Sequence, residues 1–156
     1  MPISISGDGS IGSLSATEIG YLDGVTSAVQ TQINSKLTTP GVWTSYTPTA
    51  TSTVGTITSS TNSGAYTQIG KVVIFRFETL ITNQGTASNG QLILTLPVNA
   101  ANAYVGTGVA RETDSTGTML QVYNPAATFI YIGTYTNAGF ITTNYRIRGS
   151  FTYEAA

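Results

Sequence analysis

The sequence predicts a mainly β protein, in which an antiparallel, jelly-roll-like β-sandwich follows a short N-terminal peptide and a broken helical stalk. Apolar residues recur at helical spacing up to residue 37 and at every second position in segments after Trp43. Clusters of glycine, asparagine, serine and threonine divide this second part into about nine short segments, as in a sandwich. A length of 156 residues suits one domain with a modest appendage.

Residues 1–14 have the pattern of a short strand followed by a turn, because Ile3 and Ile5 alternate with serines before Gly7-Asp8-Gly9. A peptide of this length does not fold alone. It is either a frayed terminus or an anchor that orders when it docks on a larger structure. As an anchor, it would attach through Ile3 and Ile5, which add to a sheet edge or fill pockets on the partner.

Residues 15–37 are predicted to be a helical stalk that begins at a capping box formed by Ser15 and Glu18. Asp23-Gly24 interrupts the pattern, so two short helical pieces are expected. Neither piece can bury its apolar stripe against itself. We therefore expect the stripe to meet two further copies at a threefold axis, with packing against the β domain as the alternative. The stripe consists of Ile19, Leu22, Val25, Val29, Ile33 and Leu37.

Pro40-Gly41 ends the helical pattern, which makes residues 38–42 a linker and residues 43–156 the sandwich domain. Alternating apolar positions predict strands over 73–81, 92–96 and 145–153. Further strands are expected near 46–51, 54–59, 64–69, 103–111, 118–123 and 128–135. Turns are expected at 59–64, 83–85, 113–117 and 136–139.

The composition excludes several classes of function. Charged residues make up 8% of the chain and the net charge is −1, so no electrostatic footprint for nucleic acid or anionic lipid exists. No apolar stretch is long enough for membrane insertion. The absence of cysteine and histidine removes disulfides, thiol nucleophiles and the commonest zinc ligands, so no cofactor or metal is predicted. The N-terminal residues do not resemble a secretory signal, and we expect synthesis in the cytoplasm and release by lysis.

The sequence also argues against an enzyme. Its seven carboxylates are scattered, and the nearest pair is Glu112 and Asp114, beside a predicted turn. Such a pair could bind a metal or hydrolyse a glycoside, but a solvated loop is the favoured interpretation. No histidine is present to activate a serine or threonine, which excludes the usual acyl transfer chemistry.

The aromatic residues are the remaining candidates for binding. The chain has nine tyrosines, five phenylalanines and one tryptophan. Tyrosine rings and amides on loops suit sugar recognition, because a ring packs on a pyranose face while amides match its hydroxyls. The candidate receptor contacts are Tyr123, Asn124, Tyr135 and Asn137. The alternative is that Tyr123 and Tyr135 belong to the core, as Tyr145 and Tyr153 are expected to.

Two stretches resemble bacteriophage virion proteins. Residues 14–37, with Glu18-Ile19-Gly20-Tyr21-Leu22-Asp23-Gly24 at their centre, resemble a segment of phage tail fibres and other virion appendages, found where three chains meet. Residues 43–78, Leu96-Pro97-Val98 and residues 146–156 resemble a C-terminal domain of phage structural proteins. Residues 100–145 match nothing in these proteins.

The resemblance implies a homotrimeric virion protein on the tail or the capsid exterior. We expect a short tail fibre that joins another virion protein through residues 1–14 and binds a host-surface glycan through the sandwich. The alternative is a capsid head fibre or decoration protein, anchored by its N-terminus.

Overall fold

The structure, a computed structural model, describes residues 17, 31 and 41–156. Residues Gly41–Ala156 form one compact unit. The predicted attachment contacts Ile3 and Ile5 lie outside the described residues. So does the proposed trimer stripe, which consists of Ile19, Leu22, Val25, Val29, Ile33 and Leu37. The homotrimer therefore stays a prediction.

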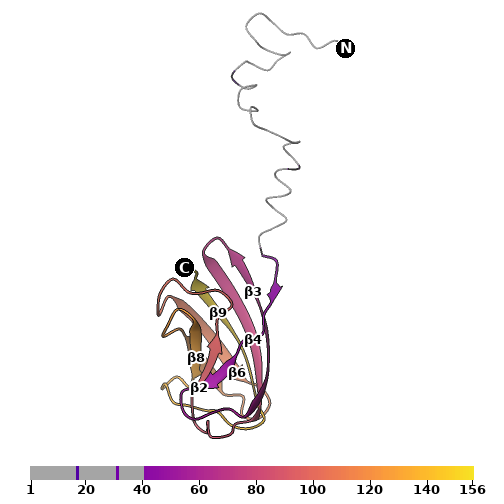
Figure 1. Cartoon of the computed structure of the whole chain (residues 1–156), viewed down its shortest axis with the longest axis vertical. Helices are drawn as coiled ribbons and strands as arrows, with labels where there is room; N and C mark the ends of the chain where they lie inside the picture. Colours follow the sequence, from indigo (N-terminus) through magenta and orange to yellow (C-terminus); the bar gives the residue numbers. More distant parts are fainter. Residues whose placement is uncertain (1–16, 18–30, 32–40) are drawn as a thin grey trace, which may run out of the picture. The chain divides into compact units, whose positions relative to one another are not determined.

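The unit is built from antiparallel strands, as predicted (Figure 1). They form one sheet in the order β1-β3-β4-β9-β6-β7-β8-β5-β2. The strands are β1 (Thr44–Ser45), β2 (Ala50–Ser52), β3 (Ser59–Ile69), β4 (Val72–Asn83), β5 (Leu92–Thr95), β6 (Gly106–Glu112), β7 (Met119–Tyr123), β8 (Phe129–Gly133) and β9 (Tyr145–Glu154). The expected mainly β fold is thus confirmed, and it takes the form of one curled sheet.

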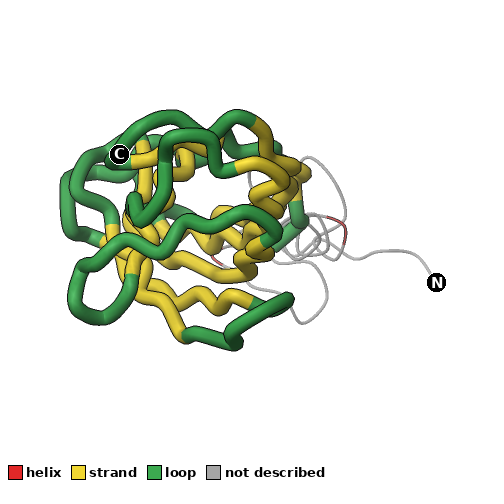
Figure 2. The backbone as a smooth tube through the Cα atoms, turned by 90° about the horizontal axis from the view of Figure 1, so that it is seen from below, coloured by secondary structure: helices red, strands yellow, loops and turns green. Residues whose placement is uncertain are grey.

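The curl follows from the position of the two edge strands, β1 and β2, which are consecutive in the chain. Residues 46–49 connect them, and the backbone N–H of Tyr46 donates to the Gly64 carbonyl on the β3 side. On the β5 side, the N–H of Thr95 donates to the Thr49 carbonyl, and the Thr95 hydroxyl lies 2.7 Å from the Tyr46 hydroxyl. This short connection links the two edges of the sheet, and the view from below shows the chain surrounding the interior (Figure 2).

The predicted period-two pattern is confirmed in the longest strands. On β4, residues 73, 75, 77, 79 and 81 are buried, and the same alternation holds in β5 and β9. Phe75 and Phe151 are cross-strand partners in the core. Complete burial of one such side chain stabilises the fold by roughly 1.5–3 kcal/mol. The sheet's inner face therefore holds the core, and its outer face is available to ligands.

One predicted turn is wrong. Residues 59–64 were expected to be a turn because they are serine, threonine, asparagine and glycine, but they form the first half of β3. Each of them pairs with a residue of β4, from Ser59 with Asn83 to Gly64 with Phe77. The long, strongly apolar β4 supplies the hydrogen bonds, and this tertiary pairing overrides the local preference of the polar residues.

Two predicted strands before β3 are also corrected. Of the expected strand 46–51, only residues 50 and 51 lie in a strand, β2. Residues 46–49 connect β1 to β2, and Pro48 among them has no N–H for the ladder. Residues 54–58 form a loop. Gly55 has φ +63° there, and a Cβ at this position would lie 2.1 Å from the Thr86 carbonyl oxygen. A left-handed glycine in such close contact is incompatible with a regular strand.

Candidate binding site on the outer face of β7 and β8

Four aromatic side chains form a row that runs from the loop before β6 across β7 and β8. We call this set the aromatic row. Neighbouring ring centroids are 6.3, 5.7 and 5.5 Å apart, within the range for favourable aromatic pairs. In order, the members are Tyr104, Tyr123, Tyr131 and Phe129.

The alternation of β7 and β8 places the row on the outer face. Leu120 and Val122 on β7 are buried, and so are Ile130 and Ile132 on β8. Residues 119, 121 and 123 on β7 and residues 129 and 131 on β8 alternate with them, point the other way and are partly or largely exposed. Tyr123 and Tyr131 are direct cross-strand partners, so the ladder itself sets their spacing.

Tyr104 is the most unusual member. Its φ is +59°, a left-handed conformation that costs a bulky residue about 1–3 kcal/mol. Its backbone N–H donates to the Asn124 carbonyl at 2.7 Å, and its ring lies nearly parallel to that of Tyr123, at 7°. The side chain is nonetheless 70% exposed. The fold thus holds a strained tyrosine where its ring extends the row into solvent.

An amide cluster adjoins the middle of the row. Tyr123 donates its hydroxyl hydrogen to the Gln91 side-chain oxygen at 3.3 Å. The Gln91 amide donates to the Asn137 carbonyl, and the Gln121 amide donates to the Asn137 side-chain oxygen. Gly133 provides space for this cluster, because a Cβ there would lie 3.0 Å from the Gln91 amide nitrogen. Apolar rings and amide groups therefore lie side by side.

The four predicted receptor contacts lie in different environments in the structure. Tyr123 belongs to the aromatic row and Asn137 to the amide cluster. Tyr135 lies in the loop after β8 and is 86% exposed, but it makes no ring contact with any aromatic residue in the described part of the chain.

The prediction for Asn124 is wrong, because this side chain is fully buried. Its oxygen accepts from the Gly106 N–H, and its nitrogen donates to the Asn102 carbonyl at 2.8 Å. These bonds hold the loop before β6 against the end of β7. Asn124 thus stabilises the loop that carries Tyr104, and its side chain is not accessible to a receptor.

Sequence reasoning missed three members of the row. Phe129 and Tyr131 alternate with Ile130 and Ile132, which is the signal of a strand with an apolar inner face and an aromatic outer face. Tyr104 had no comparable signal, because its contact with Tyr123 depends on a left-handed backbone that the local sequence does not indicate.

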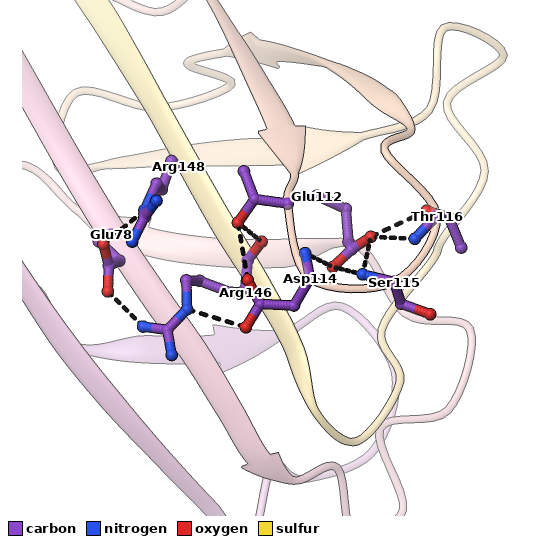
Figure 3. A network of polar contacts seen from close by, with 8 residues as sticks. Glu78, Glu112, Asp114, Ser115, Thr116, Arg146 and Arg148 are labelled. Carbon is purple, nitrogen blue, oxygen red and sulfur yellow. Dashed lines mark hydrogen bonds and ion pairs between the residues drawn. The ribbon is translucent and has the colours of Figure 1, made fainter.

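The acidic pair beside β6 has a structural role. Glu112 is fully buried, which corrects the expectation that it lies in a solvated loop; Asp114 is exposed, as expected. The Glu112 carboxylate accepts hydrogen bonds from the backbone N–H groups of residues 114–116 and from the Thr116 hydroxyl (Figure 3). The backbone N–H of Gly117 donates to it as well. Burial raises the pKa of Glu112, but these hydrogen bonds outweigh it and lower the pKa to about 2.

In the described part of the chain, no group of three or more acidic residues is placed so that it could hold a metal ion. In the same residues, no helix has the length and apolar character needed to cross a membrane. Comparisons with protein-family models, with curated proteins and with solved structures found no match.

Proposed function

We propose that the chain is a bacteriophage virion structural protein, a short homotrimeric tail fibre whose C-terminal domain binds a glycan on the host surface. The resemblance of residues 14–37 and of the ends of the β domain to phage appendage proteins supports the virion role. The aromatic row is the observation that carries the binding role.

The chemistry of the row suits a neutral sugar. A tyrosine or phenylalanine ring packs on the apolar face of a pyranose, and Tyr104 offers the most exposed ring for this contact. The Gln121 and Asn137 amides beside the row match sugar hydroxyls. Neither the row nor the amide cluster contains a charged side chain, so binding should depend little on salt.

Trimerisation would compensate for a weak individual site. Three linked copies convert the second and third contacts into intramolecular events, which raises avidity by about 10²–10⁴ without any new contact. A partly exposed row on a small domain then suffices for adsorption to a surface that carries many copies of the same glycan.

A capsid head fibre or decoration protein is the second candidate. The observation that favours it is the exposure of two large apolar side chains on the outer face of the sheet, Val72 on β4 and Val109 on β6. Exposed apolar residues of this kind suit packing against a neighbouring capsid subunit.

Labelling of particles with antibody against the chain distinguishes the two candidates, because one predicts signal at the tail and the other on the head. Purified protein should also reduce phage adsorption to host cells, whereas the variant Tyr104→Ala/Tyr131→Ala should not. Tyr135→Ala is the matched control, since it removes an exposed tyrosine outside the row. Head labelling together with no competition for adsorption would contradict the tail-fibre proposal.

A further inference from the structure

A second concave surface lies on the outer face of β1, β3, β4 and β9. We call it the arginine groove. It has a volume of about 420 Å³, which is in the range of small-ligand sites. In the sheet, β6 separates it from the β7 strand that carries part of the aromatic row. Its side chains share one face by register, and the set is Ser45, Ser63, Ala65, Arg76, Glu78 and Arg148.

The groove exists because short side chains lie between long ones. Ser63 and Ala65 on β3 are the cross-strand partners of Glu78 and Arg76 on β4. Small residues at these positions leave an open floor, and the two arginines form parts of the wall. The hydroxyls of Ser45 and Ser63 make no hydrogen bond with any described residue, so both are available to a ligand.

Among the residues that the structure describes, Arg76 is held in position without an anionic partner. Its guanidinium carbon lies 4.3 Å from the ring centroid of Trp43, a cation–π contact that fixes its orientation. Within the described residues, the other four basic side chains each contact a carboxylate or a carbonyl oxygen, but Arg76 contacts neither. An oriented guanidinium with free donors is a binding group for a carboxylate.

Glu78 does not neutralise Arg76, because both of its oxygens are already engaged. One accepts from Arg146 at 2.5 Å and the other from the Nε of Arg148 at 2.6 Å, as Figure 3 shows. Arg146 also contacts Asp114 at 2.9 Å. Arg76, Arg146 and Arg148 together therefore have two carboxylates near them, Glu78 and Asp114, which leaves this set with one positive charge in excess. The two terminal nitrogens of Arg148 remain as additional donors.

We propose that the arginine groove binds the carboxylate of an acidic sugar, such as a hexuronic acid. The Arg76 guanidinium pairs with the carboxylate, and the Arg148 terminal nitrogens supply a second contact. The hydroxyls of Ser45 and Ser63 match sugar hydroxyls, and the exposed part of the Trp43 ring covers an apolar face of the sugar. The volume of the groove and the adjacent indole favour a sugar acid over a bare inorganic anion.

The proposal is tested with the full chain and the fluorescence of Trp43, the single tryptophan of the sequence. Oligomers of glucuronic acid and of galacturonic acid are titrated in parallel with their methyl esters and with inorganic phosphate. We expect a saturable change with the acids, none with the esters, and much weaker binding of phosphate. Arg76→Gln should weaken acid binding roughly tenfold or more, because a charge-assisted hydrogen bond is lost.

Lys71→Gln is the charge control, since Lys71 lies outside the groove, contacts Glu154 and should leave acid binding unchanged when replaced. Arg76→Lys keeps the charge but loses paired donation, and it should also bind more weakly than the wild type. The proposal is overturned if neither acid binds, if the esters bind as well as the acids, if phosphate binds equally well, or if Arg76→Gln binds normally. Tyr131→Ala should leave acid binding intact, so failure here is distinguishable from failure of the proposed host-glycan site.

Discussion

The carboxylate of Glu112 accepts hydrogen bonds from both the backbone N–H and the hydroxyl of Thr116. These two bonds belong to a set in which consecutive N–H groups of the β6–β7 loop converge on one buried acid. The converging N–H groups replace the water molecules that would hydrate the carboxylate if it were exposed. The loop therefore depends on one side chain for its conformation.

Glu112→Gln should lower the free energy of unfolding by about 2 kcal/mol, because the neutral amide turns an N–H₂ donor toward N–H groups that need an acceptor. Urea unfolding followed by circular dichroism measures the change. Asp114→Asn is the control, since Asp114 is exposed and should have a smaller effect. An unchanged midpoint for Glu112→Gln would show that the loop is held by other contacts.

The free energy of unfolding should also decrease as the pH is lowered through a defined range. The pKa of Glu112 is lowered from 4.5 to about 2 in the folded protein. The unfolded state therefore takes up the proton first, and the stabilisation by Glu112 is complete above pH 4.5 and is lost as the pH falls toward 2. Glu78, whose pKa is lowered by hydrogen bonds from Arg148 and Arg146, acts in the same direction. The difference in unfolding free energy between the wild type and Glu112→Gln should thus shrink between pH 5 and pH 2. A constant difference across that range would contradict the assignment.

The contrast between β4 and Glu112 shows what the sequence could predict. The inner face of β4 was readable because burial on one face of a strand requires an apolar residue at every second position. The role of Glu112 was not, because it depends on the conformation of residues 114–117, where any residue except proline supplies the N–H. The sequence showed that Glu112 lies beside a turn, but only the folded loop determines whether its carboxylate faces water or the backbone N–H groups.

In the candidate site, too, some residues were predictable from the sequence and others were not. The aromatic residues of β8 follow a strand pattern, but the partnership of Tyr104 with Tyr123 joins residues that only the tertiary fold brings together. Asn124 was a plausible surface residue beside Pro125, and its burial reflects the close packing of the loop before β6. The long first half of β3 was missed because a polar strand owes its conformation to its neighbour β4.

Tyr104→Gly should separate stability from binding. The change relieves left-handed strain of about 1–3 kcal/mol. It also loses a ring stack of about 0.5–1.5 kcal/mol and adds backbone entropy to the unfolded chain, worth about 0.5–1 kcal/mol. These effects nearly cancel, so the unfolding free energy should change by less than about 1 kcal/mol. Binding to extracted host-surface polysaccharide should nonetheless fall, whereas Tyr135→Gly should leave it unchanged. Full retention of binding in Tyr104→Gly would remove this residue from the site.

Two left-handed glycines form a matched pair for testing the loop before β3. Gly55 and Gly70 have φ values of +63° and +59°, but only Gly55 is in close contact with another backbone segment. Gly70→Ala should cost about 1 kcal/mol of unfolding free energy, which is the strain of a left-handed alanine. Gly55→Ala should cost clearly more, because its methyl group would collide with the Thr86 carbonyl. Equal thermal stability of the two variants would contradict this account of the loop.

The final prediction concerns the two ends of the chain. Residues 1–14 carry the Ile3 and Ile5 pair expected to bind another virion protein, whereas the described domain presents the aromatic row. Deletion of residues 1–14 should leave the homotrimer intact, because the predicted trimer stripe begins at Ile19, but it should prevent incorporation into particles. Light scattering measures the first outcome and immunoblotting of purified particles the second.

Isolated residues 38–156 should compete with phage for adsorption through the aromatic row, since residues Gly41–Ala156 form a compact unit of their own. Loss of incorporation without competition would favour the capsid decoration role. Normal incorporation after the deletion would place the virion contact in the β domain, and a stable monomer of the full chain at micromolar concentration would exclude the trimer altogether.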